Sequence, residues 1–206
     1  MKIVQIKKEE IQKASLVLTE AFSEDPIFMY IFKGKEKYLK QSPWLFATWI
    51  KWAMKFGCAW MTEDGNAVIL LRAPGKSEMS FISMVRAGML PTPFKIGFGT
   101  FTRFYFGIVK TLDQKHEEVM GTRPHWYGWM VGTKLSHRGH GRILINHCSR
   151  LADEYGLPIF LETASKRNVR LYGFKNCIVA DKLFFSDGGF SLYFLVREAK
   201  KYLHSM

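Results

Sequence analysis

A short basic glycine bend is the part of the sequence with the clearest capacity for chemistry. Residues 136–142 read SHRGHGR and stand between an aromatic run and an amphipathic helical pattern. Gly139 and Gly141 would let backbone N–H groups approach a ligand at the positive end of the helix dipole. Arg138 and Arg142 add full positive charges there. The bend therefore predicts a pyrophosphate site, although a glycine turn with a solvated basic rim fits the same residues.

Two further patterns fail as ligand sites. Gly75-Lys76-Ser77 ends like a Walker A loop, but Leu70 stands where that loop needs its first glycine. His137 and His140, together with His116-Glu117-Glu118, carry imidazoles and carboxylates, yet their spacing supplies no closed set of four metal ligands. We therefore expect no metal.

The elements that position the bend follow from the spacing of apolar residues. An aromatic strand over 125–131, the bend, an amphipathic helix and an apolar strand over 158–163 together form a βαβ unit. Upstream, a short first strand precedes a helix that stops at Asp25-Pro26, and a second helical region runs from about Glu36 to Phe56 with an interruption at Pro43.

A hairpin and two final strands complete the expected sheet. Residues 58–62 and 67–71 are apolar runs separated by a turn, which indicates an antiparallel hairpin. A helical or turn segment near 167–176 leads to strands at 178–180 and 190–196. The alternation of strands and helices predicts an α/β fold.

Residues 76–121 form a mainly helical stretch rich in Met, Phe and Tyr. We expect them to be a helical insertion within one domain that covers residues 1–206. Their aromatic side chains could wall an apolar pocket, or they could pack only in the core.

Composition sets the broad class of protein. Basic residues outnumber acidic ones by 30 to 18, so the formal charge of +12 attracts polyanions. The charges are spread along the chain without a dense run, and we therefore expect no nucleic-acid partner. Three widely spaced cysteines, a polar N-terminus and charges that interrupt the apolar stretch at 81–109 predict a cytoplasmic protein with no membrane span.

The bend belongs to a longer ordered set of motifs. Met130-Val131-Gly132 ends an aromatic strand, the Arg138 to Gly141 turn opens a helix, and residues 160–168 read FLETASKRN ahead of Tyr172. In this order they resemble the GNAT superfamily of N-acetyltransferases, and within it the group around puromycin N-acetyltransferase. The likeness covers most of the chain and is weakest between 76 and 121.

The resemblance implies a GNAT (acyl-CoA N-acyltransferase) fold and acetyl-CoA as cosubstrate. The mixed central sheet would splay between the strands 125–131 and 159–163, and the pantetheine arm of acetyl-CoA would enter the gap. The cofactor-binding residues that it implies are Met130, Val131, Gly132 and Thr133 along the strand, Arg138, Gly139, His140, Gly141, Arg142 and Ile143 at the diphosphate, and Asn168 on the arm. Ile143 departs from the small residue of the family.

Acetyl transfer needs a proton acceptor for the amine and a proton donor for the thiolate. Tyr172 is the expected general acid, because a phenol of pKa about 10 can protonate a departing thiolate; a buried structural tyrosine also fits. Glu162 is the first candidate base, with His125 and Tyr127 as weaker ones, although its carboxylate could instead be satisfied by backbone or Arg167. A backbone N–H near Met130 or Val131 could stabilise the oxyanion.

We therefore expect an N-acetyltransferase that acts on a primary amine. A small molecule is the preferred acceptor, and a peptide N-terminus or lysine is the second. Two rivals stay open: a basic nucleic-acid-binding module and a non-catalytic acyl-CoA sensor. The sequence makes no prediction of oligomeric state.

Overall fold

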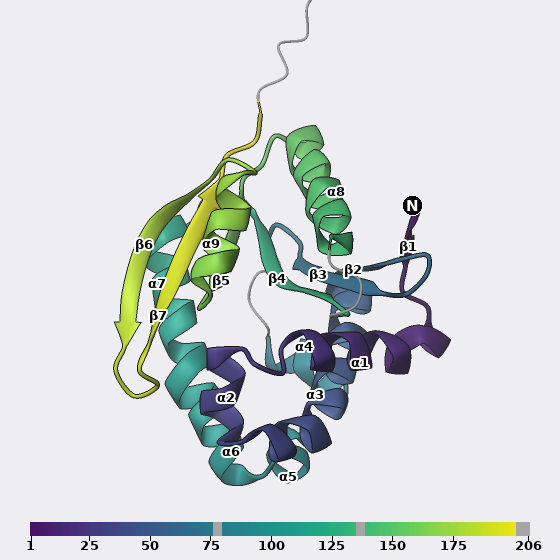
Figure 1. Ribbon diagram of the computed structural model, residues 1–206, viewed down its shortest axis with the longest axis vertical. Helices are drawn as coiled ribbons and strands as arrows, with labels where there is room; N and C mark the ends of the chain where they lie inside the picture. The colour runs from purple at the N-terminus through teal and green to yellow at the C-terminus, as the bar shows by residue number, and fades with distance from the viewer. Residues whose placement is uncertain (76–79, 135–138, 201–206) are drawn as a thin grey trace, which may run out of the picture.

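A mixed β-sheet forms the centre of the molecule (Figure 1). The computed structural model describes residues 1–75, 80–134 and 139–200. Within these ranges the sheet has seven strands in the order β1-β2-β3-β4-β5-β7-β6. Their bounds are β1 Ile3–Gln5, β2 Gly57–Thr62, β3 Ala67–Arg72, β4 Trp126–Thr133, β5 Ile159–Thr163, β6 Cys177–Phe185 and β7 Phe190–Arg197. The β4–β5 pair is parallel and the other neighbouring pairs are antiparallel.

Helices cover both faces of this sheet. Their bounds are η1 Lys8–Glu10, α1 Ile11–Ala21, α2 Pro26–Phe32, α3 Lys35–Phe56, α4 Phe81–Arg86, α5 Thr92–Ile96, α6 Phe98–Thr102, the π-helix η2 Arg103–Val109, α7 Lys110–Met120, α8 His140–Tyr155 and α9 Lys166–Gly173. One face packs on α1, α3 and α7, and the other on α8 and α9. Each face has its own apolar core. The α/β class, the hairpin and the βαβ unit expected from the sequence are confirmed.

The expected interruption at Pro43 is wrong, because α3 continues through this residue. A proline inside a helix costs about 3 kcal/mol or more. Leu45, Phe46 and Ile50 on the same helix are almost completely buried, and each such side chain contributes roughly 1.5–3 kcal/mol. Burial of this face therefore outweighs the proline.

A short helix that the spacing of apolar residues did not indicate follows α1. Asp25 caps α2 by accepting a hydrogen bond from the Ile27 backbone N–H at 3.0 Å, and Pro26 occupies the first turn. The pair that signals a stop therefore also starts a helix.

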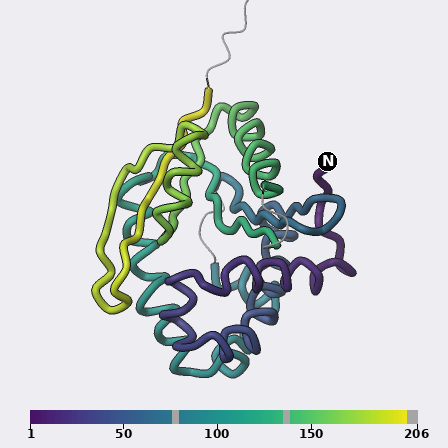
Figure 2. The backbone as a smooth tube through the Cα atoms, viewed as in Figure 1, coloured from purple at the N-terminus to yellow at the C-terminus, as the bar shows by residue number. Residues whose placement is uncertain are grey.

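The helical character expected near 76–121 is confirmed over residues 81–120. Helices α6, η2 and α7 follow one another without a break, and α7 lies beside β5 and β7 (Figure 2). Gly97, with φ +81°, interrupts the helical conformation between α5 and α6. The strand expected at 178–180 is longer in the structure, because β6 pairs with β7 along its whole length from Cys177 to Phe185.

Candidate active site

The parallel strands β4 and β5 pair over a short distance and then part. Three positions are in register, and the last joins Gly128 to Leu161. Beyond it β4 continues to Thr133 beside β3, while β5 continues to Thr163 beside β7. The sheet therefore opens between two neighbouring strands, as the resemblance implied.

A β-bulge at Trp129 marks the point of parting. Leu70 of β3 faces Met130, and Leu71 faces Gly128, so Trp129 is an extra residue on β4. A bulge bends a strand and increases its twist. The Trp129 ring is held 5.3 and 5.6 Å from the rings of two tryptophans of α3, which fixes the bend.

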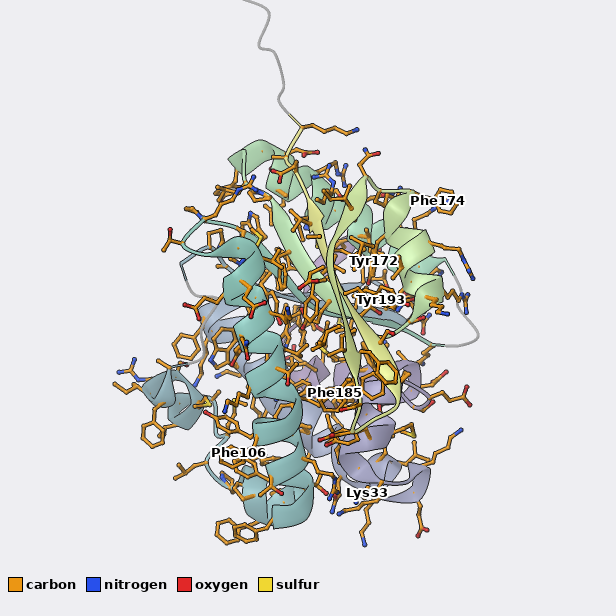
Figure 3. The ribbon with its side chains drawn as sticks, turned by 90° about the vertical axis from the view of Figure 1, so that its left-hand side faces the viewer. Lys33, Phe106, Tyr172, Phe174, Phe185 and Tyr193 are labelled. Atoms are coloured by element: carbon orange, nitrogen blue, oxygen red, sulfur yellow. The ribbon has the colours of Figure 1, made fainter. Side chains whose placement is uncertain are left out.

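A small cavity lies on the α8 and α9 face of the sheet and extends to the parting. Met130 and Val131 of β4 line it together with Leu161 of β5 and Tyr172 of α9. Tyr172 is only 8% exposed, and burial raises the pKa of its hydroxyl well above the usual value. Figure 3 shows Tyr172 inside the molecule. This tyrosine therefore keeps its proton at neutral pH.

Glu162 belongs to the opposite face of the sheet. Successive residues of a strand point to opposite faces, and its neighbour Leu161 belongs to the core under α8. The Tyr127 hydroxyl donates a 2.5 Å hydrogen bond to Glu162 Oε1, whereas Oε2 is buried without a hydrogen-bond partner among the described residues. Burial raises the pKa of this carboxyl to about 7, although Tyr127 and Arg72 act to lower it. A carboxyl of this kind can exchange a proton near neutral pH.

Residues from distant parts of the chain surround Glu162. The Arg72 guanidinium lies 4.6 Å from the ring centres of both Tyr127 and Trp129. His116 of α7 packs on Tyr127 at 5.1 Å, and its Nε2 lies 2.6 Å from that of His125. Burial, followed by the charges of His125 and Arg72, lowers the pKa of His116 to about 4.

The two weaker base candidates, Tyr127 and His125, are engaged in hydrogen bonds to other groups. Tyr127 supports Glu162, while His125 bonds through Nδ1 to the Arg123 carbonyl oxygen at 2.6 Å and through Nε2 to His116. The sequence considered His116 only as a metal ligand and did not single out Arg72, since no local pattern links either residue to Glu162.

The glycine bend is described from residue 139 onward, and Arg138 lies outside the described residues. Gly139 has φ +105° and caps α8 without a side-chain hydrogen bond. A Cβ on Gly141 would stand 3.1 Å from Thr133 Cγ2, so glycine lets α8 pack closely on the end of β4. Among the described residues, no side chain caps the first N–H groups of α8.

The remaining predicted residues are dispersed around this helix start. His140 Nδ1 lies 3.5 Å from Asp64 Oδ2 in the turn after β2. Burial acts to raise the pKa of Asp64, but hydrogen bonds from Thr62 and Asn66 hold it at about 2. Arg142 is exposed and Ile143 is half-buried.

Gly132 and Asn168, two further predicted cofactor-binding residues, contact other parts of the protein. Gly132 faces α1, because a Cβ there would stand 2.8 Å from the Ala21 Cβ. Asn168 donates from Nδ2 to Thr163 Oγ1 at 3.4 Å, and Ser165 caps its backbone N–H. These contacts place Asn168 at the start of α9, next to the end of β5.

Metal-ligand clusters and membrane-spanning helices are both absent from the described residues. Within 1–75, 80–134 and 139–200, no three His, Cys, Asp or Glu side chains are grouped so as to hold a metal ion. In the same ranges no helix has the length and apolar character that crossing a membrane requires.

Comparison with known proteins identifies relatives of this architecture. No family model matches the chain. An uncharacterised N-acetyltransferase of Schizosaccharomyces pombe is 24% identical over 174 residues, which cover 82% of this chain and 70% of the relative.

Solved structures share the fold over nearly the full length. An acetyltransferase of Corynebacterium glutamicum named for histone acetyltransferase HPA2 has a TM-score of 0.64 at 21% identity, with 98% of each chain covered. Arylalkylamine N-acetyltransferase 2 of Aedes aegypti has a TM-score of 0.64 at 12% identity, with 97% of this chain and 99% of that chain covered. The comparisons confirm the resemblance to GNAT acetyltransferases.

Proposed function

We propose that this chain, which has the GNAT fold, transfers an acetyl group from acetyl-CoA to a primary amine of a small molecule. The parting of β4 and β5 beside Tyr172, with the buried carboxyl of Glu162 on the opposite face, is the observation that carries this function. Residues 1–206 would act as one domain, in which the insertion 76–121 supplies His116 to the surroundings of Glu162.

The residues around the gap fit acetyl-CoA. No side chain within the described ranges caps the α8 N-terminus, and uncapped N–H groups at a helix start bind phosphate oxygens. Arg142 adds charge there, and Arg138 stays a proposed contact. Met130 and Val131 line the cavity into which a pantetheine arm would reach. Bound acetyl-CoA would supply a thioester, whose carbonyl carbon is open to attack by an amine.

Glu162 supplies the base in this proposal. An amine with pKa about 9 is about 1% neutral at pH 7, which costs roughly 2.7 kcal/mol. Glu162 Oε2 accepts the proton that the amine loses as the new N–C bond forms. This oxygen is buried and has no hydrogen-bond partner in the described part of the chain, and the pKa of about 7 suits that role.

Tyr172 supplies the acid. Its hydroxyl donates a proton to the sulfur as the C–S bond breaks, and a phenol carries that proton at neutral pH because its ordinary pKa is about 10. In this proposal Tyr172 acts from the α8 and α9 face of the parted strands and Glu162 from the opposite face. A backbone N–H near Met130 would stabilise the oxyanion.

A small amine is the preferred acceptor. Solved proteins of this fold include enzymes named for the acetylation of agmatine and of polyamines, which supports this choice. An Escherichia coli enzyme named as a ribosomal-protein-S18-alanine N-acetyltransferase has the same fold with a TM-score of 0.55. A peptide N-terminus therefore stays the second proposed acceptor for this chain.

A thiol-release assay with acetyl-CoA over a panel of amines tests the function. We expect Tyr172→Phe to lower turnover about tenfold or more with coenzyme A binding unchanged, and Tyr155→Phe, an exposed tyrosine of α8, to behave as the wild type. Coenzyme A binding without thiol release from any amine would instead favour the acyl-CoA sensor, and turnover of Tyr172→Phe equal to the wild type would remove Tyr172 from the mechanism.

A further inference from the structure

We propose that the outer surface of helices α4, α5, α6 and η2 docks this protein on an anionic lipid surface. Within residues 81–106, six large apolar side chains are each 61–77% exposed. These side chains, which we call the outer apolar face, are Phe81, Ile82, Leu90, Phe94, Phe98 and Phe106. Large apolar surfaces that a folded protein leaves exposed mark sites of interaction with a membrane or with another protein.

Helix α4 buries a small polar residue and exposes its large apolar ones. The buried residue of this helix is Ser83, and its Oγ accepts a hydrogen bond from Trp52 Nε1 of α3 at 2.9 Å. Phe81 and Ile82 of the same helix are exposed. A helix at the surface of a protein in water normally has the opposite arrangement, with apolar residues inside and polar residues outside.

Helices α5 and α6 repeat this inverted arrangement. Thr92 and Thr100 are buried beside Ile96, whereas Phe94 and Phe98 are exposed. The rings of Phe94 and Phe98 contact each other edge to face, with their centres 5.2 Å apart. Three successive helices therefore direct threonine or serine inward and phenylalanine outward, which suits an apolar medium on the outside.

The helices that carry the outer apolar face are neighbours in space. Helices α4 and α5 both pack on α3, α5 packs on α6, and α6 continues into η2. Figure 3 shows Phe106 at the lower left, on the side where α4 stands out, and Phe174 at the upper right. The cavity beside Tyr172 is lined by strands and by α8 and α9, so the outer apolar face is separate from it.

Positive charges accompany the outer apolar face. Arg86, Lys95 and Lys110 are exposed along this part of the chain, and no Asp or Glu occurs from residue 80 to residue 112. Lys55 of α3 adds a further cation, because its Nζ donates a hydrogen bond to the Arg86 carbonyl oxygen at 2.8 Å. Aromatic side chains can enter the boundary of the acyl chains while these cations contact anionic headgroups.

The same charges disfavour a second copy of the chain as the occupant. In a two-fold symmetric dimer the same patch meets itself, so the cations of one copy would lie against those of the other and repel them. An anionic bilayer attracts these cations instead, and the formal charge of +12 adds long-range attraction.

Cosedimentation of the purified chain with lipid vesicles tests the proposal. We expect vesicles of phosphatidylglycerol and phosphatidylcholine to bind the protein at least about tenfold more tightly than vesicles of phosphatidylcholine alone. The double variant Phe94→Ala/Phe98→Ala should weaken binding to the mixed vesicles about tenfold or more, because two rings that enter the bilayer are lost. Phe174→Ala, which removes an exposed ring at the other end of the molecule, is the matched control and should bind as the wild type.

A pair of charge reversals separates this face from the net charge of the protein. Lys95→Glu should weaken binding to the mixed vesicles about fivefold or more, since each cation near an anionic surface contributes about 1 kcal/mol. Lys8→Glu changes the net charge by the same amount at an exposed position of η1, and it should bind nearly as the wild type.

The readouts need no acetyl transfer, so they stand or fall independently of the proposed function. Failure of the wild type to sediment with the mixed vesicles would overturn the proposal, as would equal binding of Phe94→Ala/Phe98→Ala and Phe174→Ala. Equal loss in Lys95→Glu and Lys8→Glu would assign the attraction to net charge alone. A dimer that light scattering detects, and that Phe94→Ala/Phe98→Ala converts to a monomer, would assign the face to a second copy.

Discussion

Glu162 illustrates how a single residue acquires its chemistry from neighbours. One oxygen is occupied by the Tyr127 hydroxyl and the other is buried without a partner among the described residues. A carboxyl in water loses its proton near pH 4, whereas burial brings the pKa of Glu162 to about 7. The surroundings thus turn a common acidic residue into a group suited to accept a proton from an amine.

Replacement of Tyr127 tests this arrangement. The Tyr127 hydrogen bond lowers the pKa of Glu162, so Tyr127→Phe should raise that pKa and move the acidic limb of the kcat/KM profile to higher pH. We expect a several-fold loss of kcat/KM at pH 7 with KM for acetyl-CoA unchanged. A rate profile of Tyr127→Phe that superimposes on the wild type would exclude a positioning role.

Stability should also record the ionisation of Glu162. The pKa of Glu162 rises from the usual 4.5 to about 7 in the folded protein. The protonated carboxyl therefore stabilises the fold fully below pH 4.5, and this stabilisation is lost as the pH rises through about 7. The shift corresponds to about 3 kcal/mol. We expect the wild type to lose stability relative to Glu162→Gln as the pH rises from 4.5 to 7.5, when the free energies of unfolding of both proteins are measured by urea titration. Parallel curves would contradict burial as the cause.

At the scale of elements, close packing of α1 on β4 sets the position of the parting strand. Gly132 has no side chain where Ala21 and Leu18 of α1 approach, and a Cβ there would stand 2.8 and 3.0 Å from their side chains. Space for one methyl group is therefore lacking at this contact.

Gly132→Ala should lower the free energy of unfolding by about 1–3 kcal/mol, because the core would be overpacked. Gly173→Ala is the matched control, since a Cβ there meets no atom within 4 Å, and alanine at a helical position is neutral or stabilising. Denaturant unfolding measures both. Equal stability of the two variants would show that α1 shifts without cost.

At the scale of the whole molecule, two apolar cores lie on either side of the sheet, and the proposed reaction centre lies between them. A buried ion pair joins α8 to β7. Arg197 of β7 holds Asp153 of α8 with two hydrogen bonds, and both side chains are nearly inaccessible. Helix α8 is thereby fixed to the far end of the sheet.

Asp153→Ala should destabilise the protein by about 3–5 kcal/mol, because it leaves the buried Arg197 charge without its partner. Glu154→Ala, which removes an exposed carboxylate on the next residue, should change stability by less than about 0.5 kcal/mol. Thermal unfolding measures both variants. A melting temperature of Asp153→Ala within a degree of that of Glu154→Ala would contradict the importance of this pair.

The sequence alone determined features that depend on neighbouring residues. The βαβ unit, the hairpin and the helical character of 81–120 follow from periodicity and turn residues, and the ordered motifs around Tyr172 pointed to the GNAT fold. Local hydrogen bonding and apolar spacing set these features, so they are readable without coordinates.

The tertiary structure alone decided how distant residues meet. It places Arg72 between Tyr127 and Trp129, turns Gly132 toward α1, and carries α3 through Pro43. It also separates Glu162 and Tyr172 onto opposite faces of the parted strands. The energy that fixes these contacts comes from burial and packing between segments far apart in the chain, and no local pattern encodes such partners.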